Sequence, residues 1–261
     1  VPGMTIEPQV PQELLQKAKA YTDTAVISIC RFSGEGWDRK SIVETENKNI
    51  WASEEEMARR SAEIFEDGDF YLTHAEQEMV NTVKQNFARV IVVMNVGGMV
   101  DTSWFHDDAQ IQSVLMAWQG GMEGGLATAE LLAGEGNPSG KLSDTFAREL
   151  NDYPSTYNFH ESEKYVEYTD DIYVGYRYFE TIPGAKEKVN YPFGFGLSYT
   201  QFTLGESQIS IEGDQIRCMV SVTNTGAMAG KEVVQAYYGA PQGRLGKAAR
   251  VLCAFAKTRL L

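Results

Sequence analysis

A short stretch after an apolar run places one acid between two glycines. Residues 31–39 read Arg-Phe-Ser-Gly-Glu-Gly-Trp-Asp-Arg, so Glu35 stands between Gly34 and Gly36, and Trp37 follows. The glycines allow backbone conformations that other residues avoid, and they can hold one carboxyl group out at the end of a strand. Such a group can give and take a proton, and the indole offers a flat apolar face suited to a sugar ring. Taken alone, the pattern also fits a solvated turn with a packing tryptophan.

The elements around this stretch indicate an α/β fold. Residues 12–21 have helical apolar spacing, and residues 24–30 form a short run rich in β-branched residues. Such a run is typical of an interior strand of a parallel sheet that is covered on both faces. In open α/β sheets ligands bind at the carboxyl ends of the strands, which is where Glu35 would lie. The polar segment 40–71 that follows is expected to be a loop at the edge of the site.

Helices and strands then alternate. Thr73 and Glu76 have the spacing of a capping box that opens a helix through Phe87, and a strand is predicted for residues 89–95. Residues 111–118 form a third apolar run, and residues 122–133 are predicted to be a helix. This order predicts a mostly parallel sheet with flanking helices, an α/β sandwich.

The pattern changes near residue 200. Before it, we interpret residues 137–141 as a turn, 151–164 as a surface loop, 171–179 as extended and 191–199 as a packed connection between domains. After it, apolar residues alternate with polar ones, as in half-buried antiparallel strands, with a hairpin turn at Glu212-Gly213-Asp214. About four strands fit here, fewer than the roughly seven of a complete sandwich, so we predict an incomplete antiparallel β-sandwich.

Composition excludes several classes of function. The 261 residues carry a formal net charge of −13, which disfavours nucleic acid and anionic membranes as partners. No apolar run is long enough for a membrane helix, and no signal sequence is visible at the start. The three scattered cysteines are expected to be buried free thiols, which favours a cytoplasmic location. The three histidines lack metal-ligand spacing, so we expect no metal and no cofactor. The first strand is not followed by a phosphate-binding glycine fingerprint, which argues against a nucleotide-binding enzyme.

Several motifs in a fixed order resemble glycoside hydrolase family 3, the β-glucosidase family. They cover nearly the whole chain and lie at residues 33–39, 119–125, 137–142, 171–178, 191–199, 222–226 and 230–235. The resemblance implies the family's C-terminal α/β sandwich domain at residues 1–200, with its start missing. It also implies a fibronectin type III-like domain at residues 201–261, with its end missing. We therefore expect a fragment that lacks the family's (β/α)8 barrel, which carries the Asp nucleophile.

The resemblance assigns roles to two residues. Glu35 occupies the position of the family's acid/base on its Gly-Glu-Gly motif, and Trp37 that of an aromatic residue beside the leaving-group sugar. The implied activity is that of a retaining, exo-acting β-glucosidase on a β-linked oligosaccharide or aryl glycoside. β-Xylosidase, or a non-catalytic carbohydrate-binding or scaffolding module, is the alternative. We expect the fragment alone to be inactive, because one carboxylate of the pair lies on the barrel. The oligomeric state stays open.

Overall fold

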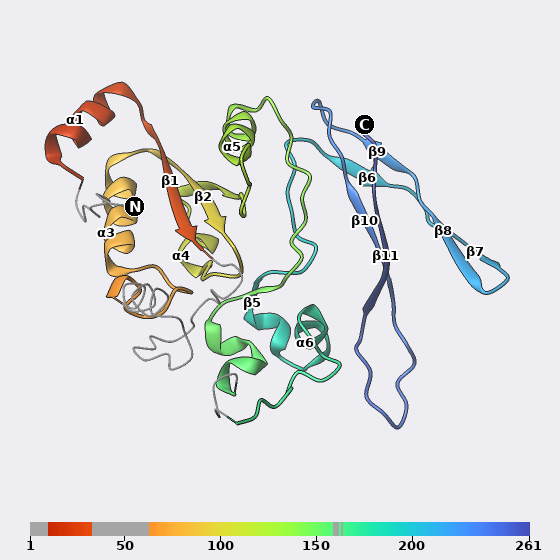
Figure 1. Cartoon of the computed structure of the whole chain (residues 1–261). Coiled ribbons are helices and arrows are strands. Elements are labelled where there is room, and N and C mark those ends of the chain that lie inside the picture. Colours follow the sequence, from red (N-terminus) through yellow and green to blue (C-terminus); the bar gives the residue numbers. More distant parts are fainter. Residues whose placement is uncertain (1–9, 33–62, 159–161, 163) are drawn as a thin grey trace. The chain divides into compact units, whose positions relative to one another are not determined.

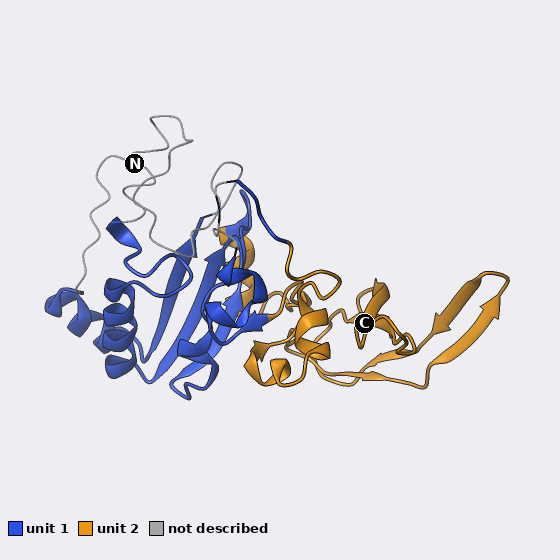
Figure 2. Ribbon diagram, turned by 90° about the horizontal axis from the view of Figure 1, so that it is seen from below, with its two compact units in different colours: residues 1–124, 146–167 blue, residues 125–145, 168–261 orange. Residues whose placement is uncertain are grey.

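The computed structural model describes residues 10–32, 63–158, 162 and 164–261. The chain forms two compact units (Figure 2). Unit 1 comprises residues 1–124 and 146–167, and unit 2 comprises residues 125–145 and 168–261. Figure 1 labels the helices and strands along the chain.

A parallel sheet forms the core of unit 1, as predicted. Its described strands are β1 (Thr24–Arg31), β2 (Arg89–Val96) and β3 (Ile111–Met116), in the order β1-β2-β3. The β1–β2 register runs from Thr24 opposite Arg89 to Arg31 opposite Val96. The central strand β2 is the most deeply buried, because it has a neighbour on each side. Its buried side chains include Val90, Val92, Met94 and Val96.

Helix α3 (His74–Asn86) lies alongside β1 and β2 (Figure 1). It begins with the predicted capping box: the Thr73 hydroxyl accepts a hydrogen bond from the Glu76 N–H at 3.1 Å, and the Glu76 carboxylate accepts one from the Thr73 N–H at 2.9 Å. Both groups satisfy backbone donors that have no partner within the helix. The prediction of a helix that starts after Thr73 is confirmed.

The two faces of β1 differ in burial. Ile27, Ile29 and Arg31 are buried on one face, and Glu76 of α3 contacts Arg31, so α3 covers that face. On the other face Val26 is 55% exposed, and Ser28 and Cys30 are also exposed. The prediction that both faces of this strand are covered is therefore wrong for the described part of the chain.

Further described elements of unit 1 are short. They are α1 (Gln12–Tyr21), α4 (Ser103–His106), β4 (Phe146–Ala147) and the 3-10 helices η1 (Leu150–Asp152) and η2 (Pro154–Tyr157). The two 3-10 helices occupy part of the region predicted as a surface loop. The Tyr153 hydroxyl, which accepts a hydrogen bond from the Ala147 N–H at 2.9 Å, anchors them.

Unit 2 contains the helices α5 (Gly124–Ala133), α6 (Tyr176–Thr181) and η3 (Ala185–Lys188) and the strand β5 (Val189–Tyr191). The first residue of α5 belongs to unit 1. Helix α6 contradicts the prediction that residues 171–179 are extended. Gly175, with φ 60° and ψ −128°, turns the chain into the helix. The Tyr176 ring then stacks on Phe193 with 4.7 Å between centroids and meets Tyr237 edge-on. These contacts with distant residues favour the helix over a strand.

The last sixty residues form antiparallel pairs, as predicted. Strand β6 (Phe202–Leu204) pairs with β9 (Val222–Asn224), β7 (Gln208–Glu212) with β8 (Gln215–Met219), and β10 (Val233–Tyr238) with β11 (Val251–Lys257). The predicted hairpin turn is confirmed, with Gly213 at φ 64° between β7 and β8. Both strands of this hairpin are exposed throughout, and Ile209 and Ile211 are 69% and 78% exposed. The prediction of half-buried strands is wrong for β7 and β8.

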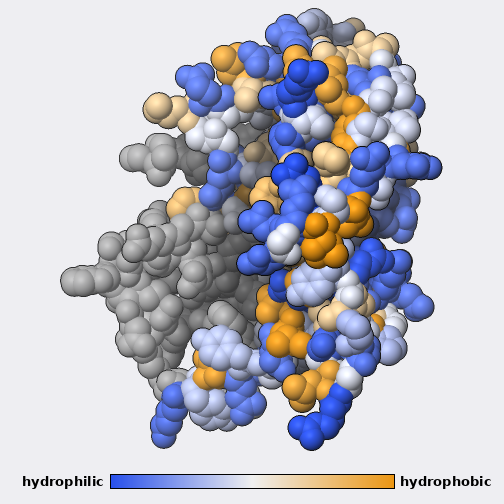
Figure 3. Space-filling model, turned by 90° about the vertical axis from the view of Figure 1, so that its right-hand side faces the viewer, coloured by the Kyte–Doolittle hydropathy of each residue, from blue (hydrophilic) through white to orange (hydrophobic). Residues whose placement is uncertain are grey.

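The surface carries more apolar and thiol groups than the sequence suggested. Figure 3 shows hydrophobic side chains in separate patches among hydrophilic ones. Cys30, Cys218 and Cys253 are all free and exposed, so the prediction of buried thiols is wrong. Each lies on a strand face that no described element covers fully. Within the described residues, the helices are too short or too polar to cross a membrane.

Candidate active site

Glu35 and Trp37, the two predicted site residues, lie outside the described residues. The structure does describe the elements on either side of the segment that carries them. Strand β1 ends at Arg31, four positions before Glu35 in the sequence, and Phe32 after it is 70% exposed. The segment therefore begins at the carboxyl end of a strand in a parallel sheet, the edge at which α/β proteins bind ligands.

Arg31 is the last residue of β1, and every N–H group of its guanidinium donates a hydrogen bond. The residue is only 3% exposed. Its Nη1 and Nη2 atoms donate to the two carboxylate oxygens of Glu76 at 2.7 and 2.6 Å. Its other three hydrogen bonds go to backbone carbonyls, from Nε to Asp69 at 2.8 Å, from Nη1 to Cys30 at 2.7 Å and from Nη2 to Tyr71 at 2.9 Å. These five bonds match the five N–H donors of an arginine.

The same guanidinium joins the two sides of the segment 33–62. Cys30 and Arg31 precede the segment, whereas the Asp69 and Tyr71 carbonyls follow it. Phe65, which also follows it, places its ring 4.7 Å from the guanidinium carbon in a cation–π contact. Arg31 therefore ties the strand that enters the segment to the chain that leaves it.

Glu76 serves two structures at once. It is the third residue of α3, where the positive end of the helix dipole favours a carboxylate, and it completes the capping box with Thr73. Its two oxygens also form the bidentate pair with Arg31. The start of α3 and the end of β1 are thereby held in one geometry.

Asp101 lies beyond the end of the neighbouring strand β2. The Gly97 N–H donates to the Arg31 carbonyl at 3.1 Å, and the Asp101 N–H donates to the Phe70 carbonyl at 2.9 Å. Burial raises the pKa of the Asp101 carboxyl, although a hydrogen bond from the Ser103 N–H at 2.8 Å opposes the shift. Burial also raises the pKa of the Tyr71 hydroxyl, and the negative charge of Asp101 adds to it.

Trp118 marks the end of the third strand. Its φ of 54° is unusual for a residue with a large side chain, and strained backbone conformations tend to cluster at functional sites. The Trp118 N–H donates to the Met94 carbonyl at 3.2 Å, and the indole lies 6.2 Å from the buried ring of Phe146. The carboxyl edge of the sheet thus presents an exposed aromatic ring, a partly buried carboxyl group and an indole, carried by Phe32, Asp101 and Trp118.

Sequence reasoning gave Arg31 and Asp101 no role. The signal for Arg31 was a charged residue at the end of a buried apolar run, because a buried charge needs partners. The partners could not be read from the sequence, since Asp69, Tyr71 and Glu76 lie 38 to 45 positions away. Asp101 gives no comparable signal.

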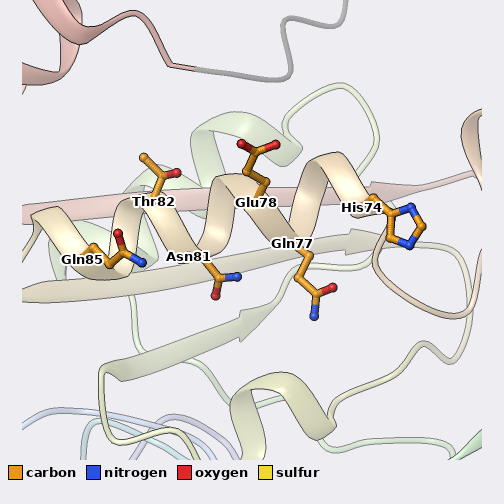
Figure 4. A pocket seen from close by; sticks show the side chains of 6 residues that line it. All are labelled: His74, Gln77, Glu78, Asn81, Thr82 and Gln85. Atoms are coloured by element: carbon orange, nitrogen blue, oxygen red, sulfur yellow. The ribbon is translucent and has the colours of Figure 1, made fainter.

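A hollow of about 440 Å³ runs along α3 (Figure 4). The described residues that line it are His74, Gln77, Glu78, Asn81, Thr82 and Gln85. Their side chains all come from one helix and point in several directions in Figure 4. Ligand sites usually have polar groups that converge within an apolar cleft, and this hollow has none of that character. The described residues also contain no group of three side chains that could hold a metal ion.

Comparisons with known proteins agree with the fold. The family model described as the glycosyl hydrolase family 3 C-terminal domain matches residues 9–199. The chain is 60% identical to β-glucosidase A of Butyrivibrio fibrisolvens, over 100% of the chain and 33% of that protein. It is 40% identical to a β-glucosidase of Ruminococcus albus, over 98% of the chain and 24% of that protein. The chain thus spans a third or less of the length of these curated relatives.

Solved structures show the same similarity. A β-glucosidase from Paenibacillus barengoltzii superimposes with a TM-score of 0.80 at 42% identity, over 97% of this chain and 25% of that one. β-Glucosidase 3B from Thermotoga neapolitana, in complex with glucose, gives 0.78 at 37% identity, over 97% of this chain and 32% of that one. Sheet, helices and antiparallel strands together define an α/β sandwich domain followed by a fibronectin type III-like region. The chain belongs to glycoside hydrolase family 3.

Proposed function

We propose that this chain supplies the acid/base half of a retaining, exo-acting β-glucosidase. The substrate would be a β-linked oligosaccharide or aryl glycoside with a terminal non-reducing β-D-glucosyl residue. The observation that carries the proposal is the position of Glu35. In the sequence it comes four positions after Arg31, the last residue of β1, in a chain 60% identical to a β-glucosidase.

The reaction requires two carboxyl groups about 5 Å apart. In the first step an Asp carboxylate on the (β/α)8 barrel attacks the anomeric carbon, while the protonated Glu35 gives its proton to the departing glycosidic oxygen. In the second step the Glu35 carboxylate takes a proton from water, and the water oxygen displaces the Asp. Each displacement inverts the anomeric carbon, so the two together retain its configuration. Trp37 would stack on the leaving-group sugar.

The first step sets a condition on the pKa of Glu35. An exposed glutamic acid is ionised at neutral pH and has no proton to give. Closure of the barrel and the substrate over Glu35 would remove water and raise its pKa, as in other glycosidases. The barrel is therefore a required partner, and the 261 residues alone should show no useful hydrolysis. Retaining β-glucosidase activity in the purified chain would refute this part of the proposal.

Leaving-group dependence tests the role of Glu35. In the full-length enzyme, Glu35→Ala should slow cellobiose hydrolysis far more than hydrolysis of 2,4-dinitrophenyl β-glucoside, whose leaving group needs no protonation. Azide should rescue the aryl reaction and give glucosyl azide of retained configuration. Small losses on both substrates without azide rescue would leave Glu35 as a structural residue.

The alternatives give different outcomes in the same assay. A β-xylosidase would hydrolyse the matching aryl β-xyloside with a higher kcat/KM than the glucoside, and the effect of Glu35→Ala would be unchanged. A non-catalytic module would bind sugar in the full-length protein without hydrolysing either glycoside. The names of the relatives favour glucose over xylose.

A further inference from the structure

We propose that Arg31 is a positioning residue for the acid/base step, and that it acts through its bidentate pair with Glu76. The inference rests on the function proposed above. Arg31 holds the residues immediately before the segment 33–62 against residues that follow it, at Asp69 and Tyr71. Glu35, the proposed proton donor, follows Arg31 by only four positions in the sequence, so we infer that Arg31 sets where it begins its approach to the substrate.

The contacts of Arg31 go beyond what an ion pair needs. Each N–H group has its own acceptor, and a planar guanidinium fixes the directions of all five hydrogen bonds. Three acceptors are main-chain carbonyls, so the group holds backbone and not only side chains. The Phe65 ring limits movement out of the guanidinium plane.

Stability alone does not account for a buried charge here. Apolar residues of similar volume often replace a buried ion pair with no loss of stability, or with a gain. A guanidinium group whose N–H groups are all hydrogen-bonded instead holds its partners in one defined geometry. Catalytic groups need such a geometry, because a displacement of about 1 Å can reduce a rate about 100-fold. The Arg31 guanidinium group lies at the carboxyl edge of the sheet, which agrees with a role in positioning a catalytic group.

The other end of α3 offers a matched comparison. There Lys84 pairs with Asp108, just before β3, and both side chains are about one fifth exposed. This pair also joins α3 to the sheet region, but it lies at the amino end of the parallel strands. The Lys84 ammonium bonds a side-chain carboxylate, whereas Arg31 holds three main-chain carbonyls as well. Lys84→Met therefore removes an α3 ion pair away from the candidate site.

The test compares two substrates in the full-length enzyme. Arg31→Met and Glu76→Gln should lower kcat/KM on cellobiose at least tenfold more than on 2,4-dinitrophenyl β-glucoside, because only cellobiose requires a well-placed proton donor. Arg31→Lys keeps the positive charge but loses the planar guanidinium group with its five donors. Its kcat/KM on cellobiose should therefore also fall more than on the aryl glucoside. Lys84→Met should change both substrates by the same factor. Thermal unfolding of each variant separates this effect from general instability.

The outcomes distinguish the inference from the proposed function. Glu76→Gln keeps the size of the side chain and an acceptor for the Thr73 cap, so it tests the pair even if Arg31→Met does not fold. Equal losses on both substrates in the Arg31 and Glu76 variants, with a selective loss in Glu35→Ala, would overturn the positioning role alone. No selective loss in Glu35→Ala would overturn the proposed function, and the positioning role with it.

Discussion

The side-chain oxygen of Asn137 accepts hydrogen bonds from the Ser198 hydroxyl at 2.8 Å and from the Tyr199 N–H at 2.9 Å, across 61 and 62 positions of the chain. The Asn137 amide group also donates to the Ala229 carbonyl at 3.1 Å. One side chain thus joins the turn after α5, the connection after β5 and the loop before β10. These bonds anchor the predicted connection at residues 191–199, although Leu197 and Tyr199 within it are 76% and 50% exposed.

Loss of this side chain should destabilise unit 2. Asn137→Ala removes three hydrogen bonds and leaves the Tyr199 N–H without its acceptor, so we expect a loss of about 1–3 kcal/mol in the free energy of unfolding. Asn137→Asp keeps the acceptor and loses only the bond to Ala229, so its loss should be smaller. Urea unfolding of both variants measures the difference. Equal losses would show that the acceptor oxygen is unimportant.

A side chain at position 196 should destabilise the folded protein. A Cβ at this position would meet the main-chain carbonyl of Gly140 and lie 3.0 Å from the Lys141 side chain. The backbone cannot move away freely, because the Leu142 N–H donates to the Phe195 carbonyl at 2.8 Å. We expect Gly196→Ala to lower the free energy of unfolding by about 1–3 kcal/mol.

Gly140 provides the control for this substitution. A Cβ there would meet nothing within 4 Å, so Gly140→Ala should leave the free energy of unfolding nearly unchanged. Chemical denaturation of the two variants side by side tests the difference. A Gly196→Ala variant as stable as Gly140→Ala would contradict the close approach of the two backbones.

The Lys84–Asp108 pair should contribute stability that depends on pH. The hydrogen bond from Lys84 lowers the pKa of the Asp108 carboxyl below its usual 3.8. The folded pKa is therefore lower than the unfolded one. The stabilisation is complete above about pH 3.8 and disappears as the pH falls through the folded pKa.

Lys84→Met should accordingly lose about 1–2 kcal/mol at pH 7, between the values for exposed and buried pairs. The gap between wild type and variant should close as the pH falls well below 3.8. Unfolding free energies across this range measure the gap. A gap that stays constant to the lowest pH would mean that the pair makes no electrostatic contribution.

Asp101 should give the opposite pH dependence. Burial raises the pKa of its carboxyl above 3.8, so the folded state binds more protons than the unfolded state in the range just above that value. Wild-type stability at this site therefore falls as the pH rises through that range. Asp101→Asn keeps an acceptor for the Ser103 N–H and carries no charge, so its stability relative to wild type should rise with pH. A difference that does not vary with pH would contradict the raised pKa.

Local signals in the sequence determined much of the fold. The Thr73–Glu76 capping box, the apolar run of β1 and the hairpin at Gly213 each depend on residues close together in the chain, so their spacing predicted them. The family motifs likewise made Glu35 and Trp37 the candidate site residues, and both stay predictions.

Only the tertiary structure decided the helix at residues 176–181, the exposure of the cysteines and of β7 and β8, and the use of Arg31. Burial depends on which layers meet. The ring that stacks on Tyr176 and four of the five acceptors of Arg31 lie many positions away in the chain. Periodicity shows which side of an element is apolar. It does not show what covers that side, because that is a property of the folded chain as a whole.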